Sequence, residues 1–158
     1  MDATEERVLA SLIRGQRWAA LATVSAEGPL GSMVAYAPEP GFAGFLLHLS
    51  RLAAHTRNLA ADPRASLVMG EPDSGVEDPQ TLGRVTITGM VEAVPPAAAD
   101  YAAARACYLE RLPTAEPLFS FGDFGLYRLV PREVRFVGGF ARAYSLGAAA
   151  LRGIAERT

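Results

Sequence analysis

The segment from His48 to Arg64 reads HLSRLAAHTRNLAADPR and combines the end of a strand with a helix and a helix stop. An apolar stripe at helical spacing is formed by Leu52, Thr56, Leu59 and Ala60. This stripe predicts a helix that packs on a core. A second stripe is polar and consists of Arg51, His55, Asn58 and Asp62. The helix is expected to end at Asp62, because a residue followed by proline disfavours the helical conformation.

The start of this helix has the residues of an anion site. Ser50 stands at the expected N-cap position, where free backbone N–H groups and the helix dipole attract negative charge. Arg51 adds a permanent charge with a planar set of donors, which suits a phosphate monoester. His55 and Asn58 follow along the same stripe and offer further donors. The residues alone leave an alternative open, which is a capped helix with a solvated polar face.

The flanking segments predict a mainly β domain with helices. Asp2 and Glu5 have the spacing of a capping box, which predicts a helix over residues 3–14. Short runs rich in apolar and β-branched residues predict strands at 18–25, 31–38, 45–50, 64–70, 83–95, 124–131 and 132–140. Further helices are expected at 97–111 and 145–157. The order predicts an α+β fold, namely a six- to seven-stranded antiparallel barrel with flanking helices in one domain, 1–158. A small barrel is filled by its own side chains, so a ligand is expected outside it or at a subunit interface.

Composition excludes several classes of function. The chain has 158 residues, a formal net charge of -2 and no lysine among its 15 basic residues, which rules out a Schiff base on a side-chain amine. The charge gives no general attraction for nucleic acid or an acidic membrane surface. The acidic N-terminal segment and the lack of a spanning apolar run lead us to expect a cytoplasmic protein. Neither the single Cys107 nor any other segment has metal-ligand spacing, so no metal site is expected.

Three segments carry a family resemblance. They are SRLAAHTRNLAADPRASLVMG at 50–70, RVTITGMVEAV at 84–94 and VPREVRFVGGFARAY at 130–144. In order and spacing they resemble the pyridoxamine 5'-phosphate oxidase-like FMN-binding split barrels. The similarity extends from Trp18 to about Leu146. The residues of the first and last segments are most similar to the branch of this family that includes haem-utilisation proteins.

The resemblance implies an FMN-binding flavoprotein that works as a homodimer, with FMN at the subunit interface. It implies an oxidoreductase acting on a small organic substrate or with a nicotinamide donor, in which the flavin performs the electron transfer. No side chain is assigned as catalytic. The cofactor-binding residues carried over by position are Ser32, Met33, Val34, Ser50, Arg51, His55, Asn58 and Gln80, and the substrate-binding residues are Arg142 and Tyr144.

The chain also departs from the oxidase pattern. Leu52 replaces the lysine that follows the Ser-Arg pair, and Arg142 is followed by Ala143-Tyr144-Ser145 without the histidine and second arginine of the oxidases' substrate site. Oxidation of vitamin B6 is therefore not expected. Two alternatives stay open, a haem-binding or haem-degrading protein of the same fold and a non-catalytic flavin carrier or sensor. Haem-degrading relatives carry a further C-terminal segment that this sequence lacks, and we interpret His48 as a core residue of its strand.

Overall fold

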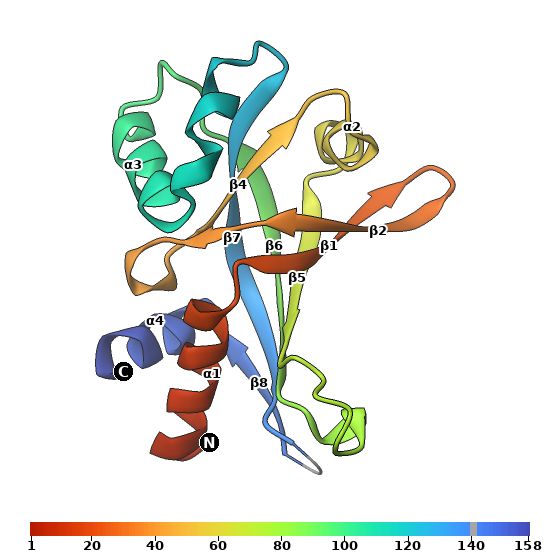
Figure 1. Cartoon of the computed structure of the whole chain (residues 1–158), viewed down its shortest axis with the longest axis vertical. Coiled ribbons are helices and arrows are strands. Elements are labelled where there is room, and N and C mark those ends of the chain that lie inside the picture. Colours follow the sequence, from red (N-terminus) through yellow and green to blue (C-terminus); the bar gives the residue numbers. More distant parts are fainter. Residues whose placement is uncertain (140–141) are drawn as a thin grey trace.

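The computed structural model of the chain describes residues 1–139 and 142–158 (Figure 1). In these ranges one antiparallel sheet contains the strands β1 (Trp18–Ser25), β2 (Gly28–Ala35), β3 (Ala37–Pro38), β4 (Phe45–Ser50), β5 (Arg64–Gly70), β6 (Arg84–Ala93), β7 (Phe124–Val137) and β8 (Ala143–Gly147). The α-helices are α1 (Ala3–Gly15), α2 (Ala54–Ala61), α3 (Tyr101–Arg111) and α4 (Ala148–Arg157). The short 3-10 helices η1 (Pro40–Phe42), η2 (Pro79–Thr81) and η3 (Pro113–Ser120) lie between these elements along the chain. The predicted class, an antiparallel barrel with flanking helices, is confirmed.

The sheet curls because β7 changes neighbours half-way along its length. The strand order is β2-β1-β5-β6-β7-β4-β3, and β8 also pairs with β7. One edge of β7 pairs with β6, whereas the other edge pairs first with β4 through residues 124–129 and then with β8 through residues 133–137. The register of β6 against β7 shifts between Thr88 and Gly89, and such a bulge increases bending and twist. The two strands predicted at 124–131 and 132–140 are thus one bent strand.

Further boundaries differ from the sequence prediction, and the helix predicted at 97–111 begins only at Tyr101. The predicted strand 31–38 is divided into β2 and β3, and the predicted helix 145–157 begins only at Ala148. Residues 143–147 pair with β7 instead, where Tyr144 and Leu146 lie opposite Phe136 and Val134. Strand pairing and burial therefore override the local helical pattern. The capping box of α1 is present as predicted, with Glu5 N donating to Asp2 at 2.9 Å and Asp2 N donating to Glu5 at 2.9 Å.

The buried side chains form two clusters on different parts of the sheet. The larger cluster fills the barrel and joins it to α1 and α4, with Leu9, Ile13, Leu151 and Ile154 among its members. The strand predicted at 83–95 is β6, and its alternating residues Val85, Ile87 and Val91 all belong to this core. The smaller cluster packs α3 on β3 and β4 through Ala37, Leu46, Ala104 and Tyr108.

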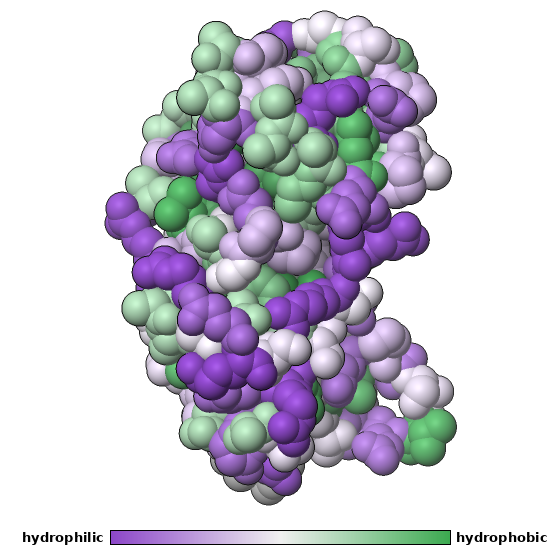
Figure 2. Space-filling model, turned by 90° about the vertical axis from the view of Figure 1, so that its left-hand side faces the viewer, coloured by the Kyte–Doolittle hydropathy of each residue, from purple (hydrophilic) through white to green (hydrophobic). Residues whose placement is uncertain are grey.

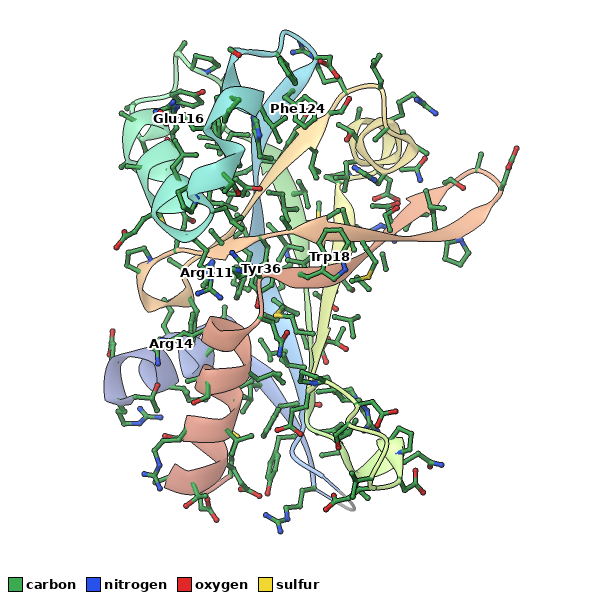
Figure 3. All side chains as sticks on the ribbon, in the orientation of Figure 1. Arg14, Trp18, Tyr36, Arg111, Glu116 and Phe124 are labelled. Carbon is green, nitrogen blue, oxygen red and sulfur yellow. The ribbon has the colours of Figure 1, made fainter. Side chains whose placement is uncertain are left out.

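The helices divide the molecule into two ends. Helices α1 and α4 lie together at the end that also holds β8, whereas α2 lies at the opposite end (Figure 1). Arg14 joins α1 to α4 by donating to the Ala155 carbonyl at 3.0 Å (Figure 3). The face that carries α3 and α4 is mixed, with hydrophilic side chains gathered over its lower half and weakly hydrophobic ones spread among polar ones over its upper half (Figure 2). Among the described residues no helix is long and apolar enough to cross a membrane.

Candidate functional site

Ser50 ends a strand and does not cap the helix that follows it. Helix α2 begins at Ala54 after a bend, and its N-cap residue Ala53 makes no side-chain capping bond. The Ser50 hydroxyl donates to the Asp123 carboxylate at 2.7 Å and accepts from Leu52 N at 3.2 Å. The predicted cap is therefore wrong. The Asp123 carboxylate therefore lies next to Ser50. It would repel a phosphate bound there, which argues against the anion site that the sequence suggested.

The bend also removes Arg51 from the polar stripe of the helix. Its backbone N donates to the Asp123 carbonyl at 2.7 Å, and its guanidinium contacts the Gly122 carbonyl. Arg51 thereby joins the end of β4 to the turn that precedes β7. The guanidinium stays exposed. It can thus still bind an anion that lies at the mouth of the adjacent cavities.

Helix α2 packs on the sheet with its apolar stripe, as predicted. Thr56 and Leu59 are buried, whereas Arg57 is exposed. Asn58 donates to the Thr23 hydroxyl of β1 at 3.1 Å, which gives its amide a structural partner. His55 is half-buried, and this burial lowers the pKa of its imidazole. Of the four residues of the predicted polar stripe, only His55 has a side chain that forms no hydrogen bond or salt bridge with the described residues.

His48 lies in an aromatic cavity between β4, η3 and the start of β7. Its ring is stacked on Phe119 with centroids 3.8 Å apart, and Phe124 and Tyr108 lie at 5.2 Å and 5.8 Å. Figure 3 shows Phe124 at the end of the molecule near η3. The cavity has a volume of about 390 Å³, and its lining includes His48, Arg51, Tyr101, Phe121, Phe124 and Tyr127. This volume lies within the range of small-molecule sites.

The imidazole of His48 is buried, neutral and incompletely bonded. Burial, with a smaller contribution from Arg105, lowers the pKa of His48 to about 4. Its Nδ1 atom is fully buried and has no hydrogen-bond partner among the described residues. Buried polar atoms are nearly always paired, so such an atom calls for a functional explanation. A neutral imidazole is the form that ligates metals.

The sequence interpretation of His48 as a satisfied core residue is only half right. The side chain is 8% exposed, as a core residue would be, but its ring nitrogen is not satisfied within the described chain. Apart from His48 and Arg51, the residues that line its cavity lie between 93 and 127, far along the sequence from β4. No local pattern around FLLHLS therefore points to this cavity.

Three predicted cofactor residues lie on β2. Val34 is buried in the core, Ser32 is half-buried on the same face, and Met33 points outward and is 50% exposed. Gln80 belongs to η2, in the exposed loop between β5 and β6. That loop lies at the end of the molecule opposite to α2 (Figure 1). Within one chain, Gln80 and the residues around α2 therefore do not form one site.

The two predicted substrate residues lie beside α1. The Tyr144 hydroxyl donates to Glu5 at 2.7 Å, and this bond lowers the pKa of the Glu5 carboxyl. The Arg142 guanidinium lies 3.8 Å from the same carboxylate. Both side chains are thus engaged with α1, at the end of the molecule opposite to His48 and α2 (Figure 1). Their assignment to a substrate stays a prediction.

Comparison with known proteins places this fold in a family. The family model described as "CREG, beta-barrel" matches residues 4–148. The chain belongs to this family. Solved structures of the pyridoxine phosphate oxidase family share its fold, with a TM-score of 0.71 over 96% of this chain at 12% identity for one from Clostridium acetobutylicum. The split-barrel resemblance is therefore confirmed at the level of the fold.

Three relatives are named for haem. The non-canonical haem oxygenase HOZ of Arabidopsis thaliana chloroplasts is 37% identical over 116 residues, which is 73% of this chain and 34% of HOZ. The haem oxygenase HutZ of Vibrio cholerae is 31% identical over 80% of this chain and 72% of its own length. A haem-binding protein from Mycobacterium smegmatis has a TM-score of 0.83 and 34% identity, over 97% of this chain and 61% of its own. The chain thus spans about a third of HOZ and three fifths of the mycobacterial protein.

These relatives correct the functional prediction. The expected cofactor was FMN and the expected function an FMN-dependent oxidoreductase, whereas the relatives that show the family are named for haem. The prediction of an FMN flavoprotein is therefore wrong, and the haem alternative fits the relatives better. The structure supplies a physical reason, since Asp123 stands where the FMN phosphate was expected and Asn58 is engaged with Thr23.

Proposed function

We propose that this chain binds haem, and that the aromatic cavity around His48 is its site. The observation that carries the proposal is the buried Nδ1 atom of His48, which has no partner among the described residues, in a side chain that lines the same cavity as Arg51. Histidine is a common proximal ligand of haem iron. The names of the relatives HOZ and HutZ support the same ligand.

The donor set around the cavity agrees with the chemistry of haem. The His48 imidazole is neutral at physiological pH because of its lowered pKa, so one of its ring nitrogens keeps a free lone pair for iron. Phe121 and Phe124 offer apolar faces to a porphyrin, and Arg51 offers a guanidinium to a propionate. The cavity is at the small end of the range for ligand sites, so a haem would be only partly enclosed by one chain.

We infer further that the chain takes part in haem degradation, as the names of HOZ and HutZ suggest for those proteins. Bound haem would supply an iron centre that can bind and activate dioxygen. The protein's own part would be to keep the His48 imidazole neutral and to orient it by its stack on Phe119. The half-buried His55 is the second candidate imidazole, because burial also keeps its pKa low.

We also propose that the chain forms a homodimer through the outer face of β1, β2 and β5. Large apolar side chains are exposed on this face, where Trp18 is 56%, Met33 50% and Val68 37% exposed. The register places Met33, Ala20 and Val68 side by side across the three strands. A contiguous exposed apolar patch of this kind is typical of a protein interface. Its occupant would be a second copy of the same face, because a two-fold axis makes a patch self-complementary.

Titration with haem tests the proposed ligand. We expect a Soret band on addition of haem to the wild-type protein, and a loss of at least tenfold in affinity in His48→Phe. Phenylalanine keeps the aromatic packing with Phe119 and removes the ring nitrogen, so circular dichroism should show an unchanged fold. His55→Phe is the matched variant. Failure of the wild-type protein to bind haem would overturn the proposal, and loss only in His55→Phe would move the ligand to α2.

A further inference from the structure

A second cavity is lined by residues of α2, the end of β6 and the start of β7, together with Arg51. Its volume is about 390 Å³, and its lining includes Thr56, Arg57, Leu59, Val91 and Tyr127. The buried side chains Thr56, Leu59 and Val91 lie at its base, being 5%, 6% and 8% exposed. The cavity shares Arg51, Ala93 and Tyr127 with the aromatic cavity but does not contain His48. We call it the α2 groove.

The charged groups that line the α2 groove are all guanidinium groups. Arg51 and Arg57 bring two guanidinium groups to its lining, and neither forms a salt bridge with a carboxylate of the described chain. Each contacts a backbone carbonyl, Arg57 that of Leu52 and Arg51 that of Gly122, which fixes the side chain while other N–H donors remain. Two fixed guanidinium groups at an apolar groove favour an anion with an apolar body.

An unsatisfied buried hydroxyl points to a ligand independently of the arginines. The Thr56 Oγ1 atom is fully buried and has no hydrogen-bond partner among the described residues, and Thr56 lines the groove. A helical threonine can bond back to a carbonyl of the preceding turn, yet no such bond is formed here. A ligand that places an acceptor in the groove would satisfy this hydroxyl.

We infer that the α2 groove binds a carboxylate carried by an apolar body. The carboxylate would lie between the two guanidinium groups, and the apolar part would contact Leu59 and Val91. The same chemistry has two sources, which are a free organic acid and a propionate arm of haem held in the neighbouring cavity. Carboxylate binding by the groove does not depend on haem binding, so the two proposals can fail separately.

Octanoate is the probe that tests this inference, with octylamine and octanol as the matched ligands. We expect octanoate to bind with a Kd of about 1 mM or tighter and to shift the methyl resonances of Leu59 and Val91. Octylamine should not bind, because it carries the wrong charge, and octanol should bind at least tenfold more weakly. Comparable binding of all three probes, or shifts elsewhere in the spectrum, would overturn the inference.

Two variants and one control separate recognition from folding. Arg57→Gln should lower the affinity for octanoate at least tenfold. Thr56→Val preserves the side-chain volume and should lower this affinity by a smaller factor. Arg84→Gln is the control, since Arg84 is also exposed and donates to backbone carbonyls but lies at the far end of β6. An unchanged affinity for octanoate in Arg57→Gln would overturn the inference, regardless of the affinity of this variant for haem.

Competition between octanoate and haem identifies the source of the carboxylate. Displacement of octanoate by haem, together with weaker haem binding in Arg57→Gln, would support the propionate arm. Simultaneous binding of both would support a free acid. If octanoate does not bind and haem affinity is unaffected by Arg57→Gln, the groove recognises no carboxylate and the inference is wrong.

Discussion

The imidazole of His48 lies parallel to the phenyl ring of Phe119, with centroids 3.8 Å apart and an interplanar angle of 7°. The Arg105 guanidinium lies 5.0 Å from the centroid of the same phenyl ring. The stack connects β4 to the segment formed by α3 and η3, which covers the histidine. This cover is what keeps the imidazole neutral, because burial and the nearby Arg105 both disfavour its protonated form.

The first prediction concerns the pH dependence of stability. The pKa of His48 is about 4 in the folded protein and ordinarily 6.5, so the unfolded chain binds more protons between these values. The free energy of unfolding should therefore fall as the pH drops from 6.5 to 4, by about 3 kcal/mol at most. His48→Phe should lose this part of the pH dependence, as measured by urea unfolding at several pH values. The contribution of His55 is common to both proteins, so parallel curves would contradict the prediction.

The second prediction concerns the ion cluster around Arg128. This half-buried guanidinium bonds to both carboxylate oxygens of Glu39 at 2.7 Å, to Asp100 at 2.7 Å and to Glu92 at 3.2 Å. Its removal in Arg128→Gln leaves the carboxylate of Glu39 without its cation, whereas Glu92 and Asp100 are more than half exposed to solvent. We therefore expect a loss of about 1–3 kcal/mol in the free energy of unfolding. Arg152→Gln is the control, because Arg152 is exposed on α4. Equal stability of the two variants would show that the cluster is not structural.

The third prediction concerns the bulge between β6 and β7. A Cβ atom on Gly89 would overlap the carbonyl oxygen of Val130 and approach its carbon to 2.8 Å, whereas a Cβ on Gly70 would have no atom within 4 Å. We expect Gly89→Ala to destabilise the fold by about 2 kcal/mol or more and Gly70→Ala to change it by less than about 0.5 kcal/mol. Thermal unfolding of the two variants measures the difference. A stable Gly89→Ala protein would mean that β7 moves aside at the bulge without cost.

The fourth prediction tests the proposed dimer. We expect the wild-type chain to be dimeric by light scattering after size-exclusion chromatography, and Met33→Arg to be monomeric because it places a charge in the apolar face. Val76→Arg is the matched control, since Val76 is 84% exposed in the loop before β6 and lies outside this face. A monomeric wild type, or a dimeric Met33→Arg, would exclude this interface.

Local sequence patterns predicted many of the elements correctly. The capping box at Asp2 and Glu5 marked the start of α1, and the run of apolar and β-branched residues at 83–95 predicted the strand β6. Such patterns depend only on residues that are close together in the sequence, so distant parts of the chain do not alter them. The Ser50 cap failed because its hydroxyl has a stronger partner in Asp123, 73 positions away.

The candidate site was hidden for the same reason. The neutral histidine, its stack and the α2 groove all arise where β4 and α2 meet residues that follow position 90. The sequence by itself determined the mainly β architecture, the packing stripe of α2 and the absence of lysine chemistry, because spacing and composition are local properties. Only the tertiary structure decided that a ring nitrogen of His48 has no partner within residues 1–139 and 142–158 and that Arg57 and Thr56 line one groove. Burial and hydrogen bonding are set by distant neighbours, which come together only when the sheet closes.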